Sequence, residues 1–128
     1  MRTIKRGKYT ELIKKEIKMT DEEYQLLYKD LCARLPYGVV MTNKTLPEIH
    51  YVLSGRDLDD ANMDGYLYDI PYLRPMSEIA NLISAKEYSQ LGGIDLVDWY
   101  NANHIDYRGL IEKGLAIKVT EENNPYKE

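Results

Sequence analysis

The sequence predicts an α+β fold, in which a small, mainly antiparallel sheet is packed by helices that come before and after it. Apolar residues recur at helical spacing between Thr20 and Leu35, and the pattern changes to a strand-like alternation after Gly38. Helical patterns return after Ser77, so the strand-like segments gather in the middle of the chain and do not alternate with helices. A chain of 128 residues is long enough for one domain with one hydrophobic core.

The predicted domain begins with a helix over residues 20–35. Thr20 and Glu23 form a capping-box pattern, in which each side chain accepts a hydrogen bond from the backbone amide of the other residue. The apolar stripe of this helix comprises Tyr24, Leu27, Tyr28, Leu31 and Leu35. Pro36 is expected to end the helix, because a residue that precedes proline is disfavoured in the helical conformation.

Strands are predicted for residues 39–42, 49–53, 66–70 and 115–119. Between the second and the third of these strands, residues 55–65 are rich in Gly, Asp and Asn, which are common in turns. We therefore expect residues 55–65 to form a loop.

Three further helices are predicted in the second half of the chain. Ser77 is expected to begin the first, which breaks and restarts at a second capping-box pattern that begins at Ser84. Residues 94–103 carry a second helical pattern. Asp106 is expected to cap a short last helix that ends at Gly114, where glycine suits a left-handed cap.

Charge is distributed unevenly along the chain. Residues 1–19 carry seven Lys or Arg and two Glu, a net charge of +5, whereas the rest of the chain has a net charge of −9. We expect a basic extension over residues 1–19 with an amphipathic helix at Thr10–Lys18, a compact domain over residues 20–119 and a flexible tail over residues 120–128. Contacts with the nucleic-acid backbone need clustered Lys and Arg. We therefore do not expect nucleic acid to bind the acidic body. It is a candidate ligand only of the basic extension.

Composition narrows the functional class further. Cys32 is the single cysteine, so the chain has no internal disulfide and no thiolate cluster for zinc. No apolar segment follows the basic N-terminus and no apolar run reaches about 20 residues, so we expect a cytoplasmic protein without membrane insertion. The chain has twelve Tyr and no Phe. Because a buried tyrosine hydroxyl needs a partner, these rings suit either the core margin or a contact surface.

One segment resembles the start of a calcium-binding loop. Its candidate oxygen ligands are Asp60, Asn62, Asp64, Tyr66 and Asp69. Gly65 stands at the sixth position, where such loops turn sharply. However, Pro71 occupies the twelfth position, where a bidentate Glu is required. We therefore predict weak calcium binding at most, and we assign no metal and no cofactor to the protein.

The segment 98–108 is the best candidate for a functional site. Its polar and aromatic residues are Asp98, Trp99, Asn101, His104, Tyr107 and Arg108. Trp, Tyr and Arg often anchor protein interfaces, which favours a partner-binding surface. The alternative is a small hydrolase or nucleotide-handling enzyme that uses His104 with Asp98 or Asp106 as an acid–base pair. A third interpretation is that Trp99 and Tyr107 belong to the core.

The sequence contains no Gly-rich phosphate loop, no Gly-x-Ser-x-Gly and no His-Glu-x-x-His. We therefore assign no catalytic residue and favour binding over catalysis.

Three blocks of the chain are similar to recurring blocks of a known group of proteins. They are residues 30–39 (DLCARLPYGV), 71–77 (PYLRPMS) and 104–116 (HIDYRGLIEKGLA). In the same order, they resemble small uncharacterised proteins that phages, prophages and mobile elements of Bacteroides-group gut bacteria encode. The resemblance spans most of residues 20–119 and does not include the first 19 residues.

The resemblance implies a phage-derived protein in the cytoplasm of the bacterial host, but it brings no activity and no site residues. Combined with the predicted binding surface, it suggests that the protein binds a host or phage protein, in host takeover or in the inhibition of a defence system. A minor role in the virion or in its assembly is the alternative. The sequence leaves the oligomeric state open.

Overall fold

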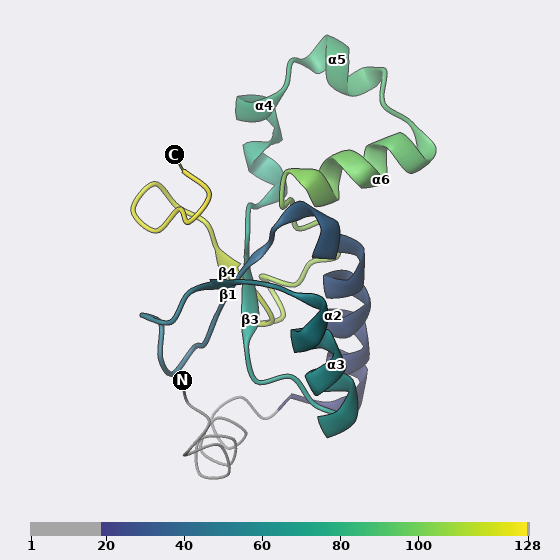
Figure 1. Ribbon diagram of the computed structural model, residues 1–128. Helices are drawn as coiled ribbons and strands as arrows, with labels where there is room; N and C mark the ends of the chain where they lie inside the picture. The colour runs from purple at the N-terminus through teal and green to yellow at the C-terminus, as the bar shows by residue number, and fades with distance from the viewer. Residues whose placement is uncertain (1–18, 128) are drawn as a thin grey trace.

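The computed structural model describes residues 19–127 and has the predicted α+β architecture (Figure 1). The strands of its sheet are β1 (Val40–Thr42), β2 (Tyr51–Val52), β3 (Ile70–Leu73) and β4 (Ile117–Lys118). Their order is β2–β1–β3–β4. β1 pairs antiparallel with β2 and with β3, whereas β3 pairs parallel with β4. The predicted fold class is confirmed. The helix predicted over Thr10–Lys18 lies outside the described residues.

The first described helix, α2 (Asp21–Arg34), forms as the sequence predicts. Thr20 Oγ1 accepts a hydrogen bond from the Glu23 amide at 3.1 Å, and Glu23 Oε1 accepts one from the Thr20 amide at 3.0 Å. Pro36 lies in a single turn of 3-10 helix, η1 (Leu35–Tyr37), and Gly38 then adopts a left-handed conformation with φ 71°. This turn sends the chain from the helix into β1.

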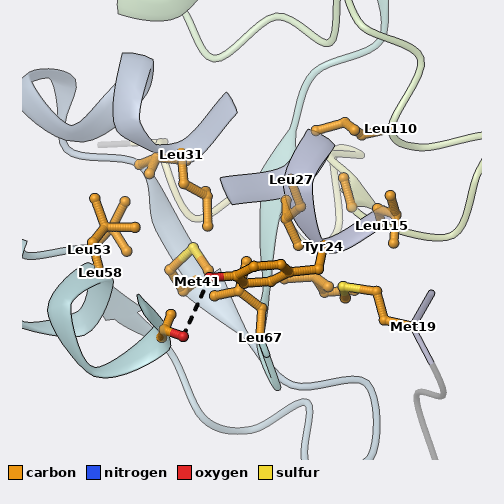
Figure 2. Close-up of a cluster of buried hydrophobic side chains, with 14 of the residues drawn as sticks. Met19, Tyr24, Leu27, Leu31, Met41, Leu53, Leu58, Leu67, Leu110 and Leu115 are labelled. Atoms are coloured by element: carbon orange, nitrogen blue, oxygen red, sulfur yellow. Dashed lines mark hydrogen bonds between the residues drawn. The ribbon is translucent and has the colours of Figure 1, made fainter. Parts of the chain in front are cut away.

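The hydrophobic core lies between the sheet and the two helices α2 and α3 (Gly55–Asp64) (Figures 1 and 2). Figure 2 labels its main members: Met19, Tyr24, Leu27, Leu31, Met41, Leu53, Leu58, Leu67, Leu110 and Leu115. The Tyr24 hydroxyl donates a hydrogen bond to the Ala61 carbonyl at 3.3 Å. The ring of Tyr24 is therefore buried while its hydroxyl keeps a partner, as a core tyrosine requires.

The expectation of a loop over residues 55–65 is wrong, because most of this segment forms helix α3. Ser54 and Asp57 make a capping box at its start, and Gly65 ends it with φ 69°. Leu58 and Ala61 lie three positions apart and are both buried against the core. The cap and these buried contacts outweigh the turn-like composition of the segment.

Residues 76–102 form a helical arm that extends away from the sheet (Figure 1). Its elements are η2 (Met76–Glu78), α4 (Ile79–Leu82), α5 (Ala85–Ser89) and α6 (Gly93–Ala102). The predicted break at Ser84 is confirmed, since Ser84 and Glu87 form a capping box at the start of α5. None of the helices within residues 19–127 is long and apolar enough to cross a membrane.

The predicted last helix does not form. Residues 110–114 make turns, and Gly109 before them has φ 77°, a left-handed conformation that interrupts a helix. Asp106 still acts as a cap, because its carboxylate accepts hydrogen bonds from the amides of Leu110 at 2.8 Å and Ile111 at 2.9 Å. Gly114 is left-handed, with φ 75°, as predicted.

Both ends of the described chain pack more closely than the sequence indicates. Met19, at the end of the predicted extension, is buried, and its amide donates to the Tyr66 hydroxyl at 2.6 Å. Near the C-terminus, the Tyr126 hydroxyl accepts from the Val40 amide at 2.9 Å and donates to the Tyr72 carbonyl at 2.7 Å. The tail therefore returns to the sheet, where Tyr126 spans β1 and β3.

The cap of α3 gives a test of the corrected helix. We expect Ser54→Ala to lower the free energy of unfolding by about 1 kcal/mol, because the Asp57 amide loses its side-chain partner. Urea denaturation measures this change. Ser77→Ala is the matched control, since Ser77 is exposed and makes no capping hydrogen bond. Equal stability of the two variants would contradict the assigned cap.

Candidate functional site

The six residues predicted to form a binding surface lie on α6 and in the segment that follows it. Asp98 is exposed on α6, and Trp99 beside it is half-buried. Asn101 and His104 are buried, whereas Tyr107 and Arg108 are half-buried. The six side chains therefore do not share one exposed face, and the contacts of the inner four decide what they do.

An ion cluster centred on Asp30 connects α2 to the segment after α6. The Asp30 carboxylate accepts hydrogen bonds from Arg34 Nε at 2.6 Å, from Arg34 Nη2 at 3.1 Å and from Arg108 Nε at 2.9 Å. Arg34 Nη2 also donates to the Ile105 carbonyl at 2.7 Å. Asp30 and Arg34 are fully buried. Loss of one partner would leave a buried charge uncompensated, which is strongly destabilising. The cluster therefore holds α2 and the segment after α6 in one relative position.

Tyr107 joins α6 to the ion cluster. Its hydroxyl donates to Asn101 Oδ1 at 3.0 Å and accepts from Arg108 Nη2 at 3.2 Å. The guanidinium carbons of Arg108 and Arg34 lie 4.9 and 5.3 Å from the centre of its ring. The ring of Tyr100 stacks on it at 5.1 Å between centroids. Asn101, Tyr107 and Arg108 are therefore committed to internal contacts.

A second tyrosine pair extends this network toward α5. The hydroxyls of Tyr88 and Tyr100 are 2.6 Å apart. This hydrogen bond, together with burial, raises the pKa of Tyr100 to about 12. The ring of Trp99 lies edge-on to Tyr88 and to Tyr100, at 6.1 Å from each. Trp99 thus lies at the border between the network and the surface of the arm.

His104 occupies an unusual position just after α6. Its backbone is left-handed, with φ 58°, which is uncommon for a residue other than glycine. Its carbonyl accepts from the Arg74 amide at 2.7 Å, and its imidazole stacks on the ring of Tyr126 at 3.8 Å. Burial and the nearby guanidinium groups of Arg34 and Arg74 lower the pKa of His104 to about 4. The imidazole is therefore neutral at pH 7.

Neither carboxylate proposed as a partner of His104 serves that role in the described structure. Asp106 uses both carboxylate oxygens to cap the following turn. Asp98 is exposed on α6, whereas His104 is buried. His104 Nδ1 is buried and has no hydrogen-bond partner among residues 19–127. The geometry thus supplies no His–Asp pair for acid–base chemistry in this segment.

The calcium-like pattern does not form a coordination loop. Asp60, Asn62 and Asp64 all lie on helix α3, where residues two apart point in different directions. Asp69 accepts from the Tyr51 hydroxyl at 2.5 Å and from Asn43 Nδ2 at 2.8 Å. Within residues 19–127, no group of three or more His, Cys, Asp or Glu side chains is arranged to hold a metal ion.

The helical arm presents an apolar surface. Ile94 is 77% exposed, Met76 45%, Val97 41% and Leu82 38%. A groove of about 430 Å³ runs between η2, α4 and α5 and is lined mainly by apolar side chains, including Met76 and Ile83. No residue from Met76 to Trp99 is buried. The arm therefore differs from the rest of the domain, which buries its apolar side chains in the core.

Sequence reasoning missed several residues of these networks, chiefly Asp30, Arg34, Arg74 and Tyr126. A local signal existed for the first two: Asp30 and Arg34 are four residues apart and share the buried face of α2 with Leu27 and Leu31. Two ionic residues on an apolar helix face indicate a buried pair. Nothing local indicates that Arg108, 78 residues away, completes it.

Comparisons with models of known protein families, with curated proteins and with solved structures find no significant match to this chain. The resemblance to phage-encoded proteins therefore stays a prediction.

The environment of His104 predicts how stability depends on pH. An unfolded histidine takes up a proton near pH 6.5, whereas folded His104 does so only near pH 4. Between these values the unfolded state binds more protons, so His104 makes the protein less stable as the pH falls from about 6.5 to 4. We expect this contribution to reach about 1.4 kcal/mol per pH unit.

Urea denaturation of the wild type and of His104→Asn between pH 7 and pH 4.5 measures this dependence. Asn is chosen because it tolerates the left-handed conformation. The variant should lose stability less steeply than the wild type, since other titrating groups are common to both. Parallel curves would contradict the burial of a neutral imidazole.

Proposed function

We propose that this protein acts by binding another protein, and that residues 76–99 of the helical arm are its binding surface. The observation that carries the proposal is that no residue of this segment is buried, although it contains many apolar side chains. Helices α4, α5 and α6 have four, five and ten residues, and helices this short are marginal in water without packing. A partner that covers the arm would supply this packing.

The chemistry of the arm indicates what kind of partner fits it. Its charged residues are Glu78, Lys86, Glu87, Asp95 and Asp98, which give it a net negative charge. Exposed Ile94 and Val97 lie three positions apart on α6, and each is adjacent in sequence to an aspartate, Asp95 or Asp98. We infer a partner with an amphipathic helix that presents apolar residues to the apolar surface of the arm and Lys or Arg to its carboxylates. Such helix-in-groove recognition is common in protein complexes.

The residues predicted from the sequence take different roles in this proposal. Asp98 and Trp99 belong to the binding surface. Asn101, Tyr107 and Arg108 support it, because their contacts connect the end of α6 to α2. His104 supports it through its backbone bond to Arg74 after β3. A partner from the host or the phage, with a role in host takeover or in the inhibition of a defence system, agrees with the sequence resemblance. A role in the virion agrees with it equally.

Ile94→Asp tests the surface directly. A partner captured from bacterial lysate is identified, purified and titrated by calorimetry against the wild type and the variant. We expect Ile94→Asp to weaken binding about 30-fold, as for an interface residue worth about 2 kcal/mol. Val52→Asp is the matched control, because Val52 is also an exposed apolar residue but lies on the sheet, outside the arm. This control should bind as the wild type does.

Two outcomes would count against the proposal. Equal binding by Ile94→Asp and the wild type would place the interface away from the exposed apolar residues of α6. A captured partner without a basic amphipathic segment would reject the inferred chemistry even if the arm is the interface. Sedimentation of the isolated protein tests whether a second copy of the chain covers the arm. Dimerisation that Ile94→Asp abolishes would mean that it does.

A further inference from the structure

The region around His104 contains three buried side-chain nitrogens that lack hydrogen-bond partners within residues 19–127. They are Arg34 Nη1, Arg74 Nε and His104 Nδ1. Arg34 is fully buried and His104 is 8% exposed. Buried polar groups in folded proteins are almost always paired, so each such nitrogen calls for an explanation, such as a bound water, an ion or a ligand. The side chains of His104 and Arg74 lie beside the Tyr126 ring, and the charge of Arg34 acts on the Tyr126 hydroxyl.

Positive charge is in excess in this region. Arg34 and Arg108 share one carboxylate, that of Asp30. Arg74 has no ion pair in the described part of the chain, and its guanidinium carbon lies 5.6 Å from the centre of the Tyr126 ring. The Asp106 carboxylate is occupied by backbone amides. A negatively charged group would therefore find both unused donors and an uncompensated charge here.

The contacts of Tyr126 show what kind of group packs against the imidazole of His104. Its ring lies flat on the imidazole of His104, with 11° between the planes, and its hydroxyl contacts the Val40 amide and the Tyr72 carbonyl. The face of the His104 imidazole thus accepts a planar ring. Residues 120–123 before it are exposed, and the Tyr126 hydroxyl connects the end of the tail to β1 and β3.

We propose that Tyr126 covers a binding site for a small aromatic anion. The ring of the ligand would replace that of Tyr126 on His104, and its carboxylate or phosphate group would bind Arg34 Nη1, Arg74 Nε and His104 Nδ1. The tail is then a displaceable cover, which lowers the apparent affinity of the site in the wild type by occupying it. The left-handed backbone of His104 agrees with this assignment, because local strain is concentrated at functional positions.

Tyr126→Ala removes the cover and tests the proposal. The probes are phenyl phosphate, inorganic phosphate and phenol, titrated by calorimetry and by the NMR signals of the His104 ring. We expect the variant to bind phenyl phosphate at least about tenfold more tightly than the wild type does, because no tail must be displaced. It should also bind phenyl phosphate about tenfold more tightly than phosphate or phenol, because each of these has only half of the recognised chemistry.

A second substitution identifies the anion site. In the Tyr126→Ala background, Arg74→Gln should remove most of the binding of phenyl phosphate. Arg56→Gln is the matched control, since Arg56 is an exposed arginine on α3. It should leave the affinity unchanged. Loss of binding in both variants would indicate a general effect of net charge and would overturn the proposal.

Further outcomes decide the proposal in the same way. If Tyr126→Ala folds and binds phenyl phosphate no better than the wild type, the covered site does not exist. If Tyr126→Ala does not fold, Tyr126→Phe replaces it as the test. This variant keeps the ring but loses both hydrogen bonds to the sheet, so the tail should open more often. It should then bind phenyl phosphate more tightly than the wild type, and equal affinity would overturn the proposal.

Discussion

The buried carboxylate of Asp30 is the interaction on which the rest of the structure depends. It receives hydrogen bonds from Arg34 on its own helix and from Arg108, 78 residues further along the chain. Arg34 also donates a hydrogen bond to the Ile105 carbonyl, and the backbone of Arg74 pairs with that of Ile105. An exposed ion pair would contribute little here, but a fully buried one must be satisfied in a single geometry. The cluster thereby sets where the helical arm leaves the domain and where His104 meets the tail.

The molecule divides into two parts with different energetics. Around the sheet, α2 and α3 bury apolar side chains in one continuous core (Figure 2). The arm has no such core and is connected to the domain through Tyr100, Asn101 and Tyr107. An arm that is firmly attached at its base but poorly packed along its length is suited to gain its stability from a partner. This division is the physical basis of the proposed binding function.

Local patterns in the sequence predicted local structure well. The caps at Thr20 and Ser84 and the apolar stripe of α2 identify their helices because each signal involves residues three or four positions apart. The prediction failed at α3, where a turn-like composition concealed the cap at Ser54, and after Asp106, where the left-handed Gly109 prevents a helix. For the candidate site, the residue types of segment 98–108 were informative, but the sequence did not predict which of these residues are exposed. His104 contacts Arg74 and Tyr126, which are distant in the sequence, and periodicity cannot reveal such contacts.

Native-state hydrogen exchange tests the central claim most directly, because it gives a free energy of opening for each amide. If the Asp30 cluster joins α2 to the segment after α6, the amides of Leu31 and Ile105 should open with the same free energy, close to that of global unfolding. Amides of the arm between Ile79 and Val97 should open at much lower free energies in the isolated protein. Equal protection of the arm and of α2 would contradict the account, since the arm would then be stable without a partner.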